Sequence, residues 1–139
     1  MNSKHLLFAL FLIFALGCIN ESKSADSQPI KLEGLTLNNN EKWVANEETH
    51  VGMTRIDSIL NNIPKLDGKV LGNALSNETS YIIKSCDMKG IAHDQLHIVL
   101  VPILEKISEI KDTENTDNLN SKINHLKSLV STYFNYFKT

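Results

Sequence analysis

The stretch that decides the fold is LHIVLVPILEKISEI, residues 96–110. Its apolar residues recur every three or four positions, a spacing that places side chains on one face of an α-helix. These residues are Leu96, Leu100, Ile103, Ile107 and Ile110. Pro102 lies inside the stretch and predicts a bend, because its ring collides with the carbonyl of Ile98 and it has no backbone N–H. We therefore predict one long amphipathic helix that begins near Ile91.

Three other segments show the same helical spacing. The first follows the N-cap residue Asn46 and continues to about Asn62, just before Pro64. The second spans about residues 67–85. The third follows a polar turn at residues 111–117, and its apolar positions are Leu119, Ile123, Leu126, Val130, Tyr133 and Phe137. Because short connections favour antiparallel neighbours, the sequence predicts an all-α fold, an antiparallel four-helix bundle.

A lead-in of about fifteen residues precedes the first helix. Residues 35–37 and 42–44 flank the turn-forming stretch 38–41, which predicts a small hairpin or a short extended segment. Trp43 lies in this lead-in. Single tryptophans usually serve packing, so we predict that Trp43 packs on the domain rather than binding a ligand.

The N-terminal residues 1–18 are typical of an export signal. Lys4 supplies a positive charge, and a nearly unbroken apolar run extends from residue 6 to residue 16. This run is too short to span a bilayer stably. It ends in ALGC, residues 15–18, which resembles a lipobox, the sequence after which lipoprotein signal peptidase cuts and the new N-terminal cysteine receives lipid. Ala15 departs from that pattern, because the lipobox usually has leucine there.

These features predict the domain organisation and the location. We expect a signal peptide at residues 1–17, lipid on Cys18, a flexible tether at 18–31 and the helical domain at 32–139. The protein would then be anchored in a membrane of the cell envelope and face the periplasm or the outer surface. An ordinary cleavage after Ala25 is the alternative.

Length and charge limit the classes of partner. The chain has 139 residues, which suits one domain, and a formal net charge of -2. No cluster of Lys and Arg falls on a predicted helix face. We therefore expect no nucleic-acid partner.

The residues that point to chemistry are concentrated in CDMKGIAHDQLH, residues 86–97. Cys86 and Met88 lie at the junction before the long helix, where Gly90 allows a tight turn. His93 and His97 are one helical turn apart, about 40 degrees around the axis, so their imidazoles share a face. Thiolate and thioether ligands select copper, and one Cys, one Met and two His are also the ligands of type 1 copper centres, although those differ in fold and spacing.

The sequence therefore predicts a metal site at Cys86, Met88, His93 and His97, with copper as the metal and zinc as the next choice. A disulfide does not explain Cys86, because the other cysteine, Cys18, carries lipid or leaves with the leader. His50 is a further candidate ligand if the first helix begins near this junction. His125 falls on a face that we predict to be solvated.

Three alternatives remain open at this point. The same residues could only lock the junction between two helices, in a structural or interaction lipoprotein without metal. The bundle could hold a non-covalent haem through histidine and methionine. Cys86 paired with His93 could be a catalytic thiol, but no residue is clearly placed to orient the histidine, and no oxyanion donors are apparent, so we do not expect an enzyme.

The segments KWVANEE, residues 42–48, and KSCDMKGIAHDQLH, residues 84–97, carry a resemblance to a known family. The chain resembles a family of short, uncharacterised bacterial envelope proteins that share a Lys-Trp-x-x-Asn-Glu segment and a Cys-x-Met-x-Gly-x-(Ala or Ser)-His-x-x-Leu-His segment. The resemblance covers most of residues 42–137 and implies that Cys86, Met88, Gly90, His93 and His97 belong together. It implies no particular activity.

Overall fold

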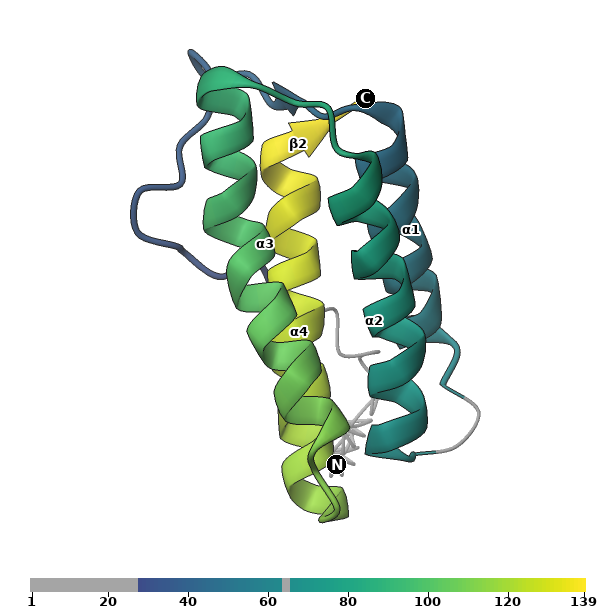
Figure 1. The fold of residues 1–139 in the computed structure, drawn as a ribbon. Coiled ribbons are helices and arrows are strands. Elements are labelled where there is room, and N and C mark those ends of the chain that lie inside the picture. Colours follow the sequence, from purple (N-terminus) through teal and green to yellow (C-terminus); the bar gives the residue numbers. More distant parts are fainter. Residues whose placement is uncertain (1–27, 64–65) are drawn as a thin grey trace, which may run out of the picture.

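The computed structural model describes residues 28–63 and 66–139. Within them, four helices form an antiparallel bundle in which each helix packs on the next one in the chain (Figure 1). The helices are α1 (Glu47–Asn61), α2 (Gly68–Ser85), α3 (Gly90–Lys111) and α4 (Thr116–Tyr136). Contacts between α1 and α4 close the bundle. The predicted all-α bundle is confirmed.

The apolar side chains that recur at helical spacing in the sequence form the hydrophobic core. The inner face of α3 buries all five predicted positions together with Val99, and α3 continues through Pro102. The largest fully buried side chains come from every helix and include Met53, Leu75, Ile103 and Tyr133. Burial of this continuous apolar face is the main favourable contribution to folding.

Local capping fixes where the helices begin. The Asp67 side chain accepts a hydrogen bond from the backbone N–H of Val70 at the start of α2, and Asn115 caps α4 in the same way. Asn46 precedes α1, but its side chain makes no capping bond to α1. Its amide instead donates to the backbone oxygen of Ser85 at the end of α2, over 3.0 Å. The start of α1 and the end of α2 are therefore direct neighbours.

The lead-in forms a tighter hairpin than the sequence suggested. Asn38 and Glu41 exchange two backbone hydrogen bonds of 2.9 Å, and Asn39 and Asn40 between them have positive φ angles. This is the geometry of a primed two-residue turn. The pairing ends there, because strand β1 (Trp43–Val44) pairs in parallel with strand β2 (Phe137–Lys138), which follows α4.

The lead-in is attached to both α3 and α4. The Gln95 side chain accepts a hydrogen bond from the N–H of Thr36 and donates another to the oxygen of Gly34, so it pairs with the lead-in as a strand would. Thr132 on α4 accepts a hydrogen bond from the N–H of Ile30. Trp43 is partly buried against the core, as predicted, and its indole N–H donates to Thr36.

Candidate metal centre

His93 and His97 lie together, as their spacing predicted. Both imidazoles project from the first two turns of α3, and their ring centroids are 4.3 Å apart. His93 is half-buried and His97 is exposed. Two neighbouring imidazoles at this spacing can bind one transition-metal ion through both rings. The pair is reachable from solvent.

Cys86 and Met88 lie on the connection between α2 and α3, which crosses one end of the bundle (Figure 1). Both side chains are partly buried and pack against the hydrophobic core. Cys86 is a free thiol and ends α2, its backbone N–H donating to the oxygen of Ile82. Gly90 has a φ of 65°, a conformation that residues with a Cβ rarely adopt. The sharp turn predicted at Gly90 is therefore present.

His50 lies on α1 and faces the last turns of α4. Its Nδ1 atom is 3.3 Å from the hydroxyl of Tyr133, and its ring meets that of Phe134 edge-on. Tyr133 is fully buried and stacks on Phe137. Burial raises the pKa of Tyr133 well above its usual value, and the negative charge of an ionised Cys86 raises this pKa further. His50 on α1 therefore contacts this buried phenol of α4.

The candidate ligands are thus not gathered at one point. The histidine pair lies on the surface of α3, His50 lies beside Tyr133, and Cys86 and Met88 pack against the core from the 86–89 connection. Within residues 28–63 and 66–139, no three His, Cys, Asp or Glu side chains lie close enough together to hold one metal ion. A four-ligand site at Cys86, Met88, His93 and His97 therefore requires the 86–89 connection to shift towards α3.

Sequence reasoning missed three polar residues at the end of the bundle where α1 begins and α2 and α4 end. Tyr133 was expected only as an apolar seam position, Asn46 only as an N-cap, and Thr49 was not singled out. Their contacts join segments that are far apart in the chain, such as His50 and Tyr133, which are separated by 83 residues. The one available signal was the proximity of the start of the first helix to the end of the second, which an up-down bundle implies.

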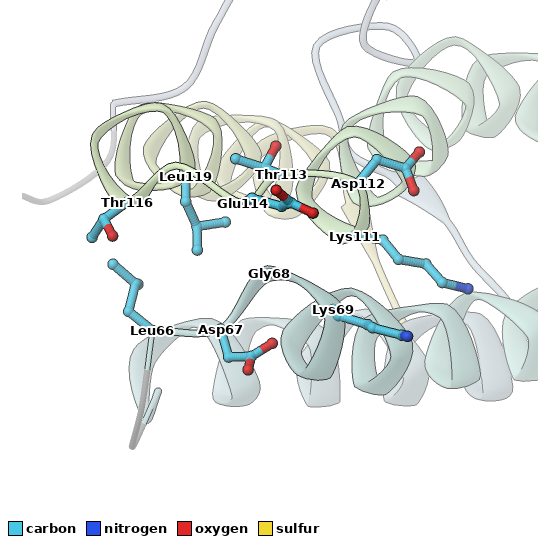
Figure 2. Close-up of a pocket in the computed structure, with 10 residues that line it drawn as sticks. All are labelled: Leu66, Asp67, Gly68, Lys69, Lys111, Asp112, Thr113, Glu114, Thr116 and Leu119. Carbon is cyan, nitrogen blue, oxygen red and sulfur yellow. The ribbon is translucent and has the colours of Figure 1, made fainter.

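A separate hollow lies at the opposite end of the bundle, between the start of α2 and the connection from α3 to α4 (Figure 2). It has a volume of about 580 Å³. Its lining combines Asp67, Asp112 and Glu114 with Lys69 and Lys111, and Figure 2 shows both lysines extending to the same side. Side chains of both charges line this hollow, so its electrostatics favour neither anions nor cations.

Cys18, the predicted site of lipid attachment, lies outside the described residues. In the described part of the chain, no helix is both long and apolar enough to cross a membrane. Comparison with protein-family models, with curated proteins and with solved structures finds no match to this chain.

Proposed function

We propose that this chain is an exported, lipid-anchored protein of the bacterial cell envelope that binds copper and holds it or passes it on. The observation that carries the proposal is the His93–His97 pair, whose ring centroids are 4.3 Å apart on an accessible face of α3. Two nitrogen ligands are already side by side, so binding a metal there requires little reordering of these side chains. Zinc is the nearest alternative metal.

Sulfur ligands favour copper over other metals at this position. Cys86 and Met88 lie seven and five residues before His93, on a connection that has no regular structure. A shift of this connection would bring the thiol and the thioether towards the first turn of α3. The Cys86 thiol loses its proton to solvent when a metal–sulfur bond forms, so copper affinity should rise with pH.

A titration of the mature protein, extracted from membranes in detergent, tests this proposal. We expect at least one Cu(I) ion to bind and to raise the melting temperature, because a ligand of the native state stabilises it by mass action. The double variant Cys86→Ser with His93→Ala should weaken binding by at least about 100-fold, since losing only an outer-shell partner already costs 10–100-fold. A parallel Zn(II) titration compares the two metals.

His125→Ala is the matched control for this titration. His125 is an exposed histidine on α4, and its replacement should leave copper affinity unchanged. Undiminished affinity in the Cys86 and His93 double variant would rule out the assigned ligands.

The second candidate function is a structural or interaction lipoprotein without metal. The observation that favours it is the packing of Cys86 and Met88 against the core, where both act as apolar side chains. In that case Cu(I) and Zn(II) should leave the melting temperature unchanged. The replacements Cys86→Ala and Met88→Leu should then affect only stability.

A further inference from the structure

A groove with a volume of about 470 Å³ lies between the end of α1 and the first two turns of α2. Val70 and Ala74 are four residues apart on α2, a spacing that places both on one face of the helix. Across the groove, the same spacing separates Ile59 in the last turn of α1 from Ile63 just after it. Two apolar surfaces therefore face each other, and the apolar lining is Ile59, Ile63, Val70, Leu71 and Ala74.

The groove has an apolar floor and an apolar rim. Leu71 is only 5% exposed and belongs to the core, and Ile59 and Ile63 pack against that core. Val70, in contrast, is 66% exposed. An apolar molecule in the groove would remove this side chain from water, which favours binding. Small-molecule sites have volumes of about 300–1,000 Å³ and are mostly apolar with a few polar groups, so the groove has their size and lining.

Two polar side chains of the groove present hydrogen-bond acceptors. The Nδ2 atom of Asn62 donates to the backbone oxygen of Ser58 over 2.8 Å, which leaves its Oδ1 atom as an acceptor. The Asp67 carboxylate accepts a hydrogen bond from the N–H of Val70 over 3.0 Å, and this bond holds it beside the rim. A carboxylate can accept several hydrogen bonds and donates none. The polar part of the groove therefore suits a group that donates hydrogen bonds.

The charge of the groove is negative. Among the described residues that line it, Asp67 is the only charged one. Lys69 and Lys111 line the hollow of Figure 2 and not this groove. A carboxylate beside an apolar surface attracts a cation and repels an anion. An alkyl chain that ends in an ammonium group is therefore favoured over one that ends in a carboxylate.

We propose that this groove binds a small molecule with an apolar body and a positively charged end that donates hydrogen bonds. The apolar body lies against the isoleucines, Val70 and Leu71, and the charged end lies against the oxygens of Asp67 and Asn62. The inference goes beyond the proposed function, because it concerns another part of the bundle and requires no metal.

The test compares octylamine and octanoate, which have alkyl chains of similar length and opposite charges. The mature protein is kept free of detergent, in phosphatidylcholine nanodiscs where it carries lipid, because detergent would compete for the groove. Octylamine should shift the methyl resonances of Val70, Leu71 and Ala74 saturably. It should leave Val101 unchanged, an exposed apolar residue of α3 that serves as an internal control.

Octanoate should bind at least about threefold more weakly than octylamine, since an ion pair at an exposed site contributes little but repulsion replaces it. Equal affinity for the two probes would overturn the inference. So would the absence of a saturable shift at the groove, or an equal shift at Val101.

Variants separate the charge from the apolar lining. Asp67→Asn retains a good helix cap and removes the charge, so it should abolish the preference for octylamine over octanoate. Ala74→Phe should fill the groove and prevent binding of both probes, whereas Asn73→Phe, at the exposed neighbouring position, should leave binding unchanged. Val70→Ser, on the exposed rim, should weaken octylamine binding and serves if Ala74→Phe does not fold.

A preference that persists in Asp67→Asn would overturn the inference, as would wild-type affinity in the variants of Ala74 and Val70. None of these substitutions touches a candidate metal ligand, so copper affinity should stay unchanged in all of them. The groove and the proposed function can therefore fail independently.

Discussion

Tyr133 is the buried residue of α4 that contacts the candidate ligand His50 on α1. It touches His50, stacks on Phe137 and lies within the electrostatic range of Cys86. Its phenol is buried, so its pKa lies above the usual value of a tyrosine, mainly because the charged phenolate would lose its hydration. One side chain therefore links the packing of the core to His50 on α1.

This raised pKa predicts a loss of stability in alkali. Above a pH of about 10, the unfolded chain releases the Tyr133 proton while the folded protein retains it, so the unfolded state binds fewer protons. The free energy of unfolding should therefore fall by up to about 1.4 kcal/mol per pH unit from this group. Urea unfolding of the wild type and of Tyr133→Phe measures this fall in the free energy of unfolding. The measurements run from about pH 8 to about pH 11, on both sides of the usual tyrosine pKa of about 10. Parallel curves for the two proteins would contradict this account.

Close contacts at two glycines bring the helices together. A Cβ atom at Gly52 on α1 would collide with the side chain of Ile82 on α2. A Cβ atom at Gly72 on α2 would lie 2.5 Å from the Cβ atom of Lys111 and 2.7 Å from its Cα atom. The end of α3 is therefore packed against the backbone of α2, and relief at Gly72 would require the main chain of α3 to move.

Gly72→Ala should destabilise the protein although alanine is the better helix former. Overpacking costs about 1–3 kcal/mol, while the gain in helix propensity is about 1 kcal/mol, so we expect a net loss of up to about 2 kcal/mol. Thermal unfolding measures the change. Asn73→Ala, at the exposed neighbouring position of α2, controls for propensity alone and should not lower the melting temperature. Equal melting temperatures for the two variants would show that the close contact is unimportant.

At the scale of the whole molecule, distant parts of the chain meet at one end of the bundle. The parallel pairing of β1 with β2 brings Trp43 beside Phe137, and Lys138 forms an ion pair with Glu41. The 86–89 connection lies at this same end. The candidate ligands and the strand pair therefore share one end, and the hollow in Figure 2 lies at the other.

The proposed lipid attachment at Cys18 concerns the whole protein, and fractionation tests it. Expressed in a bacterium, the protein should be found with the membranes, and mass spectrometry of the mature N-terminus should show diacylglycerol on Cys18. Cys18→Ser should lose the lipid. A mature protein that begins at Asp26 without lipid would instead establish the ordinary cleavage after Ala25.

The sequence predicts helices and contacts within a helix well, because each depends only on residues that are close together in the chain. The four helices follow from apolar spacing and caps, and the His93–His97 contact follows from one turn of helix. The pairing of Trp43 with Phe137 has no such signal, because two-residue strands carry almost no pattern. The contact of His50 with Tyr133 depends on how α1 packs on α4, so His50 was only a conditional candidate and Tyr133 was missed.

The position of β2 and Tyr133 in the chain has a consequence for the order of assembly. A chain that emerges N-terminus first presents α1, α2 and α3 before Tyr133 and Phe137 exist in the folding compartment. The His93–His97 pair needs only its own helix, whereas the surroundings of His50 need the end of α4. On the proposed route of export, the proposed receiving pair for metal would thus form early, and the packing around His50 only after all four helices have crossed.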